Sequence, residues 1–477
     1  MSVLNAAQKN AVAELLRVSP VADELGRRFG AAGHELHLVG GSVRDALLGR
    51  LGDDLDFCTD ARPEQTLAVV QGWADAIWET GREFGTIGIQ KHGLRIEITT
   101  FRAEAYDGVT RNPVVEYGDS LLGDLERRDF TINAMAVSLP GHEFTDPYGG
   151  LDDLAAQVIR TPAAPSQSFG DDPLRMLRAA RFAAKLQFTV DQKVISAMRD
   201  MAADLDRITA ERIRDEFTKL MCGADPIVGL RLLVDTGLAD RFIPEISGLK
   251  LEIDEHAQHK DVYEHTLIVV QNAMRLEGDE GPDFTLRMAA LMHDIGKPAT
   301  KAVGRDGRVS FHHHEVVGAR MTKQRMKAMK YPKDVITDVV ELVGLHLRFY
   351  GYGRGEWTDS AVRRYVTDAG PLLTRLHKLT RSDVTTRNRR KAANLAADYD
   401  ALEERIARLA EEEDLARVRP DLDGNAIMEL LGVPPGPVVG QAWRFLKELR
   451  LDRGPLTRDE AEAELFKWAR DNGHLSS

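Results

Sequence analysis

The sequence predicts an α+β protein in which a small mixed α/β head precedes an almost wholly helical remainder. Between residues 35 and 150, short β-type runs alternate with helical patterns. From Pro173 onward, apolar residues recur at spacings of three and four, and β-branched runs are few, as in packed helices. A chain of 477 residues is long enough for about three domains.

The first region contains four predicted strands, and Lys91, His92 and Gly93 form the turn of a hairpin between the last two. The strands are expected at residues 37–39, 55–58, 85–90 and 94–100. Helices are expected at residues 43–48, 63–77 and 132–137. This alternation predicts one compact α/β unit.

After the head, each domain boundary is expected to lie between two helices. The segment Pro-Glu-Ile-Ser-Gly at 244–248 is expected to connect two helical regions, because Pro and Gly end helices readily. Eight of the fourteen histidines lie between His256 and His346, which sets the region after this connector apart. We therefore expect five parts: an N-terminal helix (1–34), the head (35–160), a helical neck (161–250), a histidine-rich helical domain (251–390) and a helical tail (391–477).

Composition predicts a soluble protein of the cytoplasm with no membrane partner. No segment near the length of a membrane-spanning helix lacks charge, and the first thirty residues lack the apolar core of a signal peptide. Two cysteines, Cys58 and Cys222, are too few for a disulfide framework.

The net charge of −12 argues against nonspecific wrapping of nucleic acid, which depends on Lys and Arg neutralising phosphates. A nucleic-acid partner would need local basic patches, and each candidate patch could equally be a solvated face. The candidates are Arg175, Arg178 and Arg181; Arg325, Lys327, Lys330 and Lys333; and Arg387, Arg389, Arg390 and Lys391.

A Gly-Gly pair, Gly40 and Gly41, is followed after a short helical stretch by Asp54 and Asp56. Residues two apart in a strand point to the same face, so both carboxylates can bind one pair of Mg²⁺ ions. The glycines leave backbone amides open to phosphate oxygens. An Asp-x-Asp alone is more often an acidic turn, but the preceding glycines favour a site for a metal-bound triphosphate.

Two further residues complete this predicted centre. In the run from Arg95 to Thr99, strand alternation puts Glu97 on one face and the isoleucines on the other, which makes Glu97 the third predicted catalytic carboxylate. Arg44, just after the glycines, can donate charge-assisted hydrogen bonds to phosphate. Paired Mg²⁺ ions can activate an attacking hydroxyl and neutralise leaving pyrophosphate, which is what nucleotidyl transfer requires.

The stretch from Leu38 to Asp56 resembles the signature of the class II tRNA nucleotidyltransferase and bacterial poly(A) polymerase family, and further matches extend over residues 35–250. This resemblance implies a polymerase-β-like nucleotidyltransferase head followed by a helical neck and body that select the nucleotide and bind tRNA. It also implies Mg²⁺-dependent transfer from CTP and ATP to an RNA 3′ end.

Residues 124–136 resemble the family's motif that contacts ribose and phosphate. Arg128 can reach a phosphate, and Asp129 can accept a hydrogen bond from a ribose hydroxyl, which would favour ribonucleotides. The alternative is a charged helix start capped by Asp129.

A third motif resembles the family's base-selecting segment. It consists of Asp171, Asp172, Pro173 and Arg175, followed by Arg178 and Arg181. A carboxylate and a guanidinium can hydrogen-bond the edge of a base, and the resemblance makes Asp172 and Arg175 an amino-acid template for CTP and then ATP. Arginines three apart form a positive ridge. Asp171 replaces the family's usual Glu, and Asp172 before Pro173 is also a good helix N-cap.

Two weaker resemblances accompany these motifs. Residues 101–113 are similar to the family's flexible loop, whose presence implies that adenosine can be added, although an ordinary surface loop would look the same. Glu211, Arg212 and Glu216 resemble the helical motif that braces the template, and we interpret them as structural.

His293 and Asp294, within the run from Leu291 to Lys297, resemble the signature of HD-domain phosphohydrolases. Imidazole and carboxylate suit Mg²⁺ or a transition metal, and the resemblance puts His265, His346 and Asp383 among the ligands of a second divalent metal. A lone His-Asp pair is more often a hydrogen bond, but the nearby His314 adds to the signal.

The favoured hypothesis is an enzyme that adds or repairs the 3′-terminal CCA of tRNA. Its nearest competitor is a poly(A) polymerase, whose bacterial members tend to have a basic stretch where this chain has Gly81 to Thr86 with an acidic Glu83. A metal-dependent HD-domain phosphohydrolase and a noncatalytic RNA-binding module are further alternatives. An intact set of head residues disfavours both.

Overall fold

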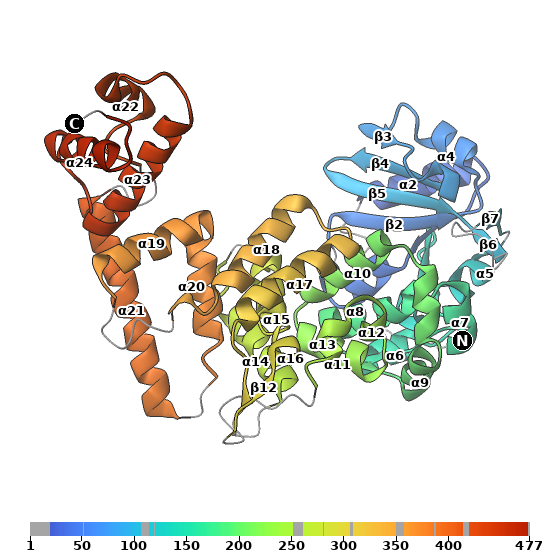
Figure 1. Cartoon of the computed structure of the whole chain (residues 1–477). Helices are drawn as coiled ribbons and strands as arrows, with labels where there is room; N and C mark the ends of the chain where they lie inside the picture. The colour runs from blue at the N-terminus through green and yellow to red at the C-terminus, as the bar shows by residue number, and fades with distance from the viewer. Residues whose placement is uncertain are drawn as a thin grey trace. The chain divides into compact units, whose positions relative to one another are not determined.

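The computed structural model describes two compact units, Met1–Pro244 and Glu245–Ser477, and each is considered by itself. The described residues are 20–50, 52–105, 114–118, 120–250, 261–279, 281–305, 309–349, 357–385, 388–413 and 419–475. Figure 1 shows the sheet of the first unit in blue and the helices that follow it in green.

The first unit contains a seven-stranded mixed sheet with the order β3-β4-β5-β2-β1-β8-β9. Its strands are β1 (Leu36–Val39), β2 (Asp54–Thr59), β3 (Ala76–Trp78), β4 (Thr86–Lys91), β5 (Leu94–Thr100), β8 (Ala136–Leu139) and β9 (Phe144–Thr145). β2 and β5 pair in parallel, and the other pairings are antiparallel. The four strands predicted from the sequence are confirmed.

The predicted hairpin is also confirmed, with a tighter turn than expected. Lys91 pairs with Leu94, so the turn consists of His92 and Gly93 alone. Their φ angles are 50° and 86°, the left-handed conformation that the favoured two-residue hairpin turns require. Gly93 adopts it without steric cost.

The prediction of a helix over residues 63–77 is wrong beyond the first two turns. Helix α4 covers Pro63–Val70, and Gly72 then adopts a φ of 73°, which a continuing helix does not allow. Ala76–Trp78 forms the edge strand β3 on β4. The helix expected over 43–48 is confirmed as α3 (Gly41–Leu47).

The helix expected over 132–137 is wrong as well. Thr131–Asn133 forms a single 3-10 turn, η2, and the chain then enters β8 between β1 and β9. Residues 134–137 are all almost completely buried. A strand buried on both faces reads as a short continuous apolar run, which periodicity cannot distinguish from a buried helix.

Helices make up the rest of the first unit. They are α2 (Pro20–Ala31), α5 (Leu121–Glu126), α6 (Gly150–Ala156), α7 (Pro165–Asp171), α8 (Leu174–Leu186), α9 (Gln192–Asp200), η3 (Ala202–Arg207), α10 (Ala210–Met221), α11 (Pro226–Asp235) and α12 (Ala239–Phe242). Helix α8 packs against both α10 and α11. Short strand pairs β6 (Arg102–Ala105) with β7 (Val114–Tyr117), and β10 (Val158–Ile159) with β11 (Thr189–Val190), were not expected.

Helix α13 (Pro244–Ser247) stands where a connector was expected, at the boundary of the two units. The second unit contains α14 (Val262–Arg275), α15 (Phe284–Met292), α16 (Lys297–Thr300), β12 (Ala302–Val303), β13 (Val309–Ser310), α17 (His314–Ala328), α18 (Lys333–Leu345), α19 (Asp359–Ala369), η5 (Gly370–Leu372), α20 (Leu373–Ser382), α21 (Arg389–Glu412), α22 (Gly424–Leu431), α23 (Pro437–Arg453) and α24 (Arg458–Asp471). Helix α15 packs against α14, α18 and α20, and α22 to α24 share a small core of their own. None of the described helices is long and apolar enough to span a bilayer.

Gly150, at the start of α6, tests how tightly the buried 3-10 turn η2 is packed. A Cβ atom at this position would lie 2.2 Å from the carbonyl oxygen of Thr131 and 2.8 Å from Cγ of Met135. We expect Gly150→Ala to destabilise the first unit by about 1–3 kcal/mol through overpacking. Urea unfolding followed by hydrogen exchange of the β1 and β8 amides would measure this loss.

Gly170, in α7, is the matched control, since a Cβ atom there would have no neighbour within 4 Å. Gly170→Ala should leave the first unit as stable or up to ~1 kcal/mol more stable. Equal effects of the two substitutions would contradict the packing argument.

Candidate active site

The loop between β1 and α3 depends on glycine. Gly40 has φ 68° and ψ −133°, a backbone conformation essentially reserved for glycine. A Cβ atom on Gly40 would lie 2.8 Å from Nη1 of Arg128, so the missing side chain also makes room for this guanidinium. The predicted Gly-Gly turn therefore lets the Arg128 guanidinium lie close to the backbone of Gly40 at one end of β2.

The predicted acidic residues share one face of the sheet. Along β2, Leu55 and Phe57 are buried while Asp54 and Asp56 are exposed. In the parallel pair of β2 and β5, Asp56 is the register partner of Glu97. The hydroxyl of Ser42 accepts a hydrogen bond of 2.9 Å from the amide of Asp56, which joins α3 to this strand.

The electrostatics of these carboxylates favour a cation. The pKa of Asp56 is raised, first by desolvation and then by the charges of Glu97 and Asp54, while Arg128 and Arg44 oppose the rise. A divalent cation would relieve both the desolvation and the mutual repulsion. Asp54 and Asp56 line the adjoining cavity, and Glu97 stands beside Asp56 without lining it.

An open cavity of about 550 Å³ brings the three sequence motifs together. All nine residues predicted to bind nucleotide line it: Gly40, Gly41, Arg44, Arg128, Asp129, Asp172, Arg175, Arg178 and Arg181. The cavity thus joins the acidic strand to a wall of guanidinium groups, an arrangement suited to a triphosphate with its metal.

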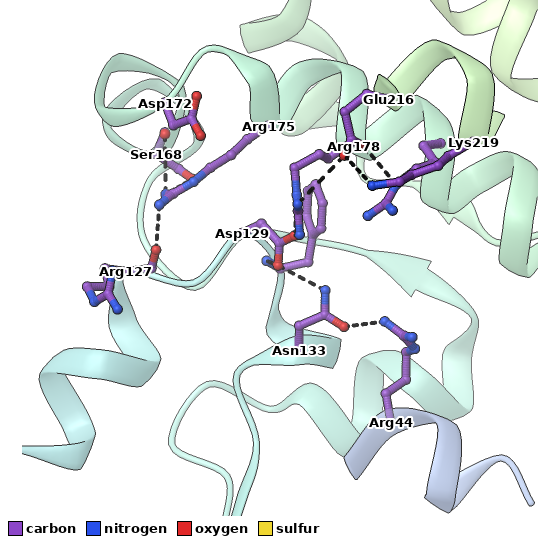
Figure 2. A network of polar contacts seen from close by, with 12 residues as sticks. Arg44, Arg127, Asp129, Asn133, Ser168, Asp172, Arg175, Arg178, Glu216 and Lys219 are labelled. Carbon is purple, nitrogen blue, oxygen red and sulfur yellow. Dashed lines mark hydrogen bonds and ion pairs between the residues drawn. The ribbon is translucent and has the colours of Figure 1, made fainter. Parts of the chain in front are cut away.

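Polar contacts hold the side chains of this wall, and those that link Arg44 to Arg178 are drawn in Figure 2. Arg44 makes two hydrogen bonds of 2.8 Å to Asp45 and a third to the amide oxygen of Asn133. Asn133 in turn donates to Asp129 at 2.9 Å. Arg128 is held by the buried Asp124 at 2.9 and 3.2 Å. These contacts fix the directions of two predicted phosphate-binding arginines.

Asp129 lines the cavity, and its carboxylate is also bound by neighbouring side chains. One carboxylate oxygen accepts from the Phe130 amide and from Asn133, and the other accepts twice from Arg178, at 2.8 and 2.5 Å. Burial alone would raise its pKa, but Arg178 and Asn133 lower it to about 2. Because four donors already use this carboxylate, it holds Arg178 in place.

Both residues of the predicted template are positioned by their neighbours. One oxygen of Asp172 caps α8 through the Leu174 amide at 3.1 Å, and the other accepts from Arg212 at 3.0 Å. Arg175 donates to the hydroxyl of Ser168 at 2.9 Å and to the carbonyl oxygen of Arg127 at 2.6 Å. The cap and the template interpretations of Asp172 are therefore compatible.

Helix α10 supports the arginine ridge from behind, as the sequence suggested for Glu216. The carboxylate of Glu216 lies 2.9 Å from Nε of Arg181, 3.9 Å from Nη1 of Arg178 and 3.7 Å from Nζ of Lys219. Burial lowers the pKa of Arg181, whose guanidinium carbon lies 4.3 Å from the ring centroid of Phe182.

Sequence reasoning missed several residues of the cavity. Asn133 joins Arg44 to Asp129, and Asp124 orients Arg128; both lie in the 124–136 motif, but the motif gave neither of them a role. Lys185, one helical turn after Arg181, is an additional cation that lines the cavity. The spacing of three and four along α8 could have signalled Lys185.

Part of the predicted loop and part of one predicted basic patch lie outside the described residues. Residues 106–113 of the loop at 101–113 are outside them, and the strand pair β6 and β7 closes its base. Arg387 of the third basic patch is also outside, whereas α21 begins at Arg389.

The second unit contains a buried cluster of histidines and carboxylates. Nε2 of His265 lies 2.9 Å from Asp383, and Nε2 of His293 lies 3.1 Å from Asp294. Two groups offer ligand atoms within 4.8 Å of one another: His265, His293 and Asp383, and Asp294, His314 and His346. The five predicted ligands thus come together, and His314 joins them.

The imidazoles of this cluster are oriented for metal. Nδ1 of His293, His314 and His346 lies 2.7–2.8 Å from a backbone carbonyl oxygen, which fixes each ring and directs its Nε2 into the cluster. Nε2 of His293 and Nε2 of His314 lie 3.1 and 3.2 Å from Asp294 oxygens, whereas Nε2 of His346 has no hydrogen-bond partner among the described residues. Burial lowers the pKa of His346 to about 4, so this ring is neutral.

Three family descriptions match successive parts of the chain. "Poly A polymerase head domain" matches residues 36–160, "Probable RNA and SrmB-binding site of polymerase A" matches 187–249, and "HD domain" matches 262–414. They coincide with the sheet and its cavity, with the helices around α10, and with the histidine cluster.

Relatives span the chain to different extents. The A-adding tRNA nucleotidyltransferase of Deinococcus radiodurans is 34% identical over 444 residues, which are 91% of this chain and 95% of the relative. The CCA-adding enzyme of Limosilactobacillus reuteri is 42% identical over 208 residues, 43% of this chain and half of the relative. A crystal structure of the Bacillus stearothermophilus CCA-adding enzyme with CTP has the same fold, with a TM-score of 0.67 at 24% identity over 95% of this chain and 98% of that one.

The fold, the motifs and these relatives define an RNA nucleotidyltransferase. The chain belongs to the family of tRNA nucleotidyltransferases and poly(A) polymerases, with an HD domain after the polymerase part.

The lowered pKa of Asp129 makes a prediction about acid stability. Its pKa falls from 3.8 to about 2 in the folded chain, so the carboxylate adds stability that is complete above pH 4 and is lost as the pH falls toward 2. We expect Asp129→Asn to cost the first unit about 2 kcal/mol at pH 7, a difference that narrows below about pH 4. Urea unfolding between pH 7 and pH 3 would measure it.

Asp152 is the matched control, because it is an exposed aspartate on α6 of the same unit. Asp152→Asn should change stability by less than about 0.5 kcal/mol at every pH. If the wild-type protein exceeds Asp129→Asn in free energy of unfolding by as much at pH 3 as at pH 7, the ionised Asp129 carboxylate is not the cause of the difference.

Proposed function

We propose that this protein completes the 3′-terminal CCA of tRNA in the cytoplasm, using CTP and ATP without a nucleic-acid template. The observation that carries the proposal is a single cavity lined by Asp54 and Asp56 at one side and by Asp172 and Arg175 at another. Phosphate chemistry and base choice can therefore act on one bound nucleotide.

In the proposed reaction, the 3′ oxygen of the RNA attacks the α-phosphorus of the nucleotide. A new O–P bond forms, the bond between the α-phosphorus and the bridging oxygen breaks, and pyrophosphate leaves. Asp54, Asp56 and Glu97 would hold Mg²⁺, which supplies Lewis-acid activation when bound. Arg44 and Arg128, oriented by Asn133 and Asp124, would bind the triphosphate, and Lys185 is a further cation for it.

Base choice would rest on protein side chains alone. Asp172 and Arg175 offer an acceptor and donors, and both are held by neighbours on α7, α10 and the Arg127 carbonyl. Held side chains can discriminate between bases because an unpaired polar group would be left behind by a wrong one. Arg178, fixed by Asp129, would complete the wall that faces the nucleotide.

The relatives support addition of the terminal adenosine most directly. The Deinococcus relative, which matches almost the whole chain, is named for A addition, and two relatives that match less than half of the chain are named for CCA addition. Glu83, which stands where bacterial poly(A) polymerases tend to be basic, favours tRNA end synthesis over long A tracts.

An extension assay tests this function. We expect the protein with Mg²⁺, CTP and ATP to add three nucleotides to tRNA lacking CCA, and ATP alone to add one adenosine to tRNA ending in CC. Asp56→Asn should slow both reactions by at least about 10³-fold, because it removes a predicted metal ligand. Sequencing gels of the 3′ products would show each step.

Asp53, the exposed neighbour of Asp54, provides the control. Asp53→Asn should retain nearly full activity. Addition of A alone would restrict the function to the last step, long A tracts would favour a poly(A) polymerase, and no extension would contradict the proposal.

A second function is supported by the histidine cluster: metal-dependent hydrolysis of a phosphate ester in the HD domain. Six potential ligands converge there, and the buried Nε2 of His346 has no hydrogen bond among the described residues. Burial opposes a charge on His293, yet Asp294 and Asp383 raise its pKa to about 10, so the two carboxylates require a nearby positive charge. A divalent metal held by these residues would supply that charge and could activate water.

Metal analysis tests this second site. We expect the purified protein to contain at least one divalent metal ion per chain and to hydrolyse bis(p-nitrophenyl) phosphate. His314→Ala should lose the metal and the hydrolysis while CCA addition continues, because His314 lies outside the nucleotide cavity. Mass spectrometry of bound metal and absorbance at the nitrophenolate band would measure both.

His312 is the matched control, an exposed histidine two residues earlier. His312→Ala should retain metal and hydrolysis. Metal-free protein after purification and after incubation with Mn²⁺, Ni²⁺ or Co²⁺ would refute a metal centre.

A further inference from the structure

Helix α17 carries a row of exposed cations that the proposed chemistry does not use. We propose that this row, the α17 stripe of Arg320, Lys323 and Lys327, binds the phosphate backbone of the RNA substrate. The inference rests on the proposed function for its choice of RNA. It assigns an RNA-contacting surface to the HD-domain unit, separate from both the nucleotide cavity and the histidine cluster.

The stripe follows from the helical period. Its residues are spaced by three and by four, so their side chains leave the helix in nearly one direction. The buried residues Gly318 and Thr322 lie on the opposite side, where α17 packs on α16 and α18. Burial of that side keeps the stripe facing outward.

In the part of the chain that the structure describes, no acidic residue neutralises the stripe. Among the described residues, none of its three cations forms an ion pair within 4.0 Å. Arg325 on the same helix is different, because its Nε lies 2.8 Å from a Glu245 carboxylate oxygen and it belongs to the fold. The second basic patch predicted from the sequence began at Arg325. Because Arg325 is paired with Glu245, the exposed row on this helix begins at Arg320 instead.

Local composition sets the surface apart from the rest of the chain. Residues 316–333 contain six Lys or Arg and no Asp or Glu, in a protein whose net charge is −12. Solvated charge in such a chain would ordinarily be mixed in sign. An acidic protein that binds RNA needs a local patch of this kind to release counterions from phosphates.

The shape of the stripe fits phosphates better than a lipid surface. Seven residues separate Arg320 from Lys327, a rise of about 10 Å, so its three cations can neutralise about three phosphates. A membrane-surface helix would carry Trp, Phe or Leu beside its cations, whereas Val316, Gln324 and Ala328 are the exposed neighbours here.

Binding of the full-length protein to tRNA at several salt concentrations tests the proposal. We expect the triple variant Arg320→Gln, Lys323→Gln, Lys327→Gln to bind tRNA at least about tenfold more weakly at low salt, with a log–log salt slope smaller by about 2–3. In extension assays, its KM for tRNA should rise while kcat and the KM for ATP stay unchanged. Because tRNA binding is measured without nucleotides, a failure of this proposal can be distinguished from a failure of CCA addition.

A scattered variant controls for total charge. Arg27, Arg408 and Lys467 are exposed on α2, α21 and α24, and changing all three to Gln alters the net charge equally. This control should keep at least half of the affinity. The proposal is overturned if both variants weaken binding alike, if the stripe variant keeps its affinity and salt slope, or if the stripe binds anionic vesicles but not tRNA.

Discussion

The buried carboxylate of Asp129 is the point on which the nucleotide site depends. It receives two hydrogen bonds from the chain after β7 and two from Arg178 on α8, so it joins the sheet to the helical part of the first unit. An ionised carboxylate is costly to bury unless each oxygen is paired. Satisfying it therefore fixes Asn133 and Arg178 together, and Asn133 carries the constraint on to Arg44.

The cavity that results contains opposed charges whose complement is a metal-bound nucleotide. Desolvation and then the carboxylates on β2 and β5 raise the pKa of Asp56, and burial lowers that of Arg181 on the other wall. Without a ligand, the charged forms of the Asp56 carboxylate and of the Arg181 guanidinium are therefore less stable than usual. A triphosphate with Mg²⁺ supplies negative charge to the arginines and positive charge to the carboxylates, so binding relieves both walls at once.

The HD domain applies the same principle to a separate cluster. Asp294 and Asp383 are held among imidazoles whose Nδ1 atoms are engaged, and Nε2 of His293 faces both carboxylates. The pKa of each carboxyl is well below its usual range, because neighbouring cations and hydrogen bonds outweigh burial. The two units thus present two separate places where buried charge favours a cation, and the α17 stripe presents exposed cations instead.

Sequence alone determined four strands of the sheet, the motifs and the chemistry of their residues, since strand alternation and Gly-Gly followed by Asp-x-Asp are local signals. It also predicted five metal ligands in the second unit, which the structure brings together with His314. Only the tertiary structure decided that Ala136–Leu139 is a central strand, that Gly72 ends α4, and that Asp129 binds Arg178 at the cavity. The reason is physical: a buried apolar run has no period to read, and a carboxylate's partners come from residues far apart in the chain.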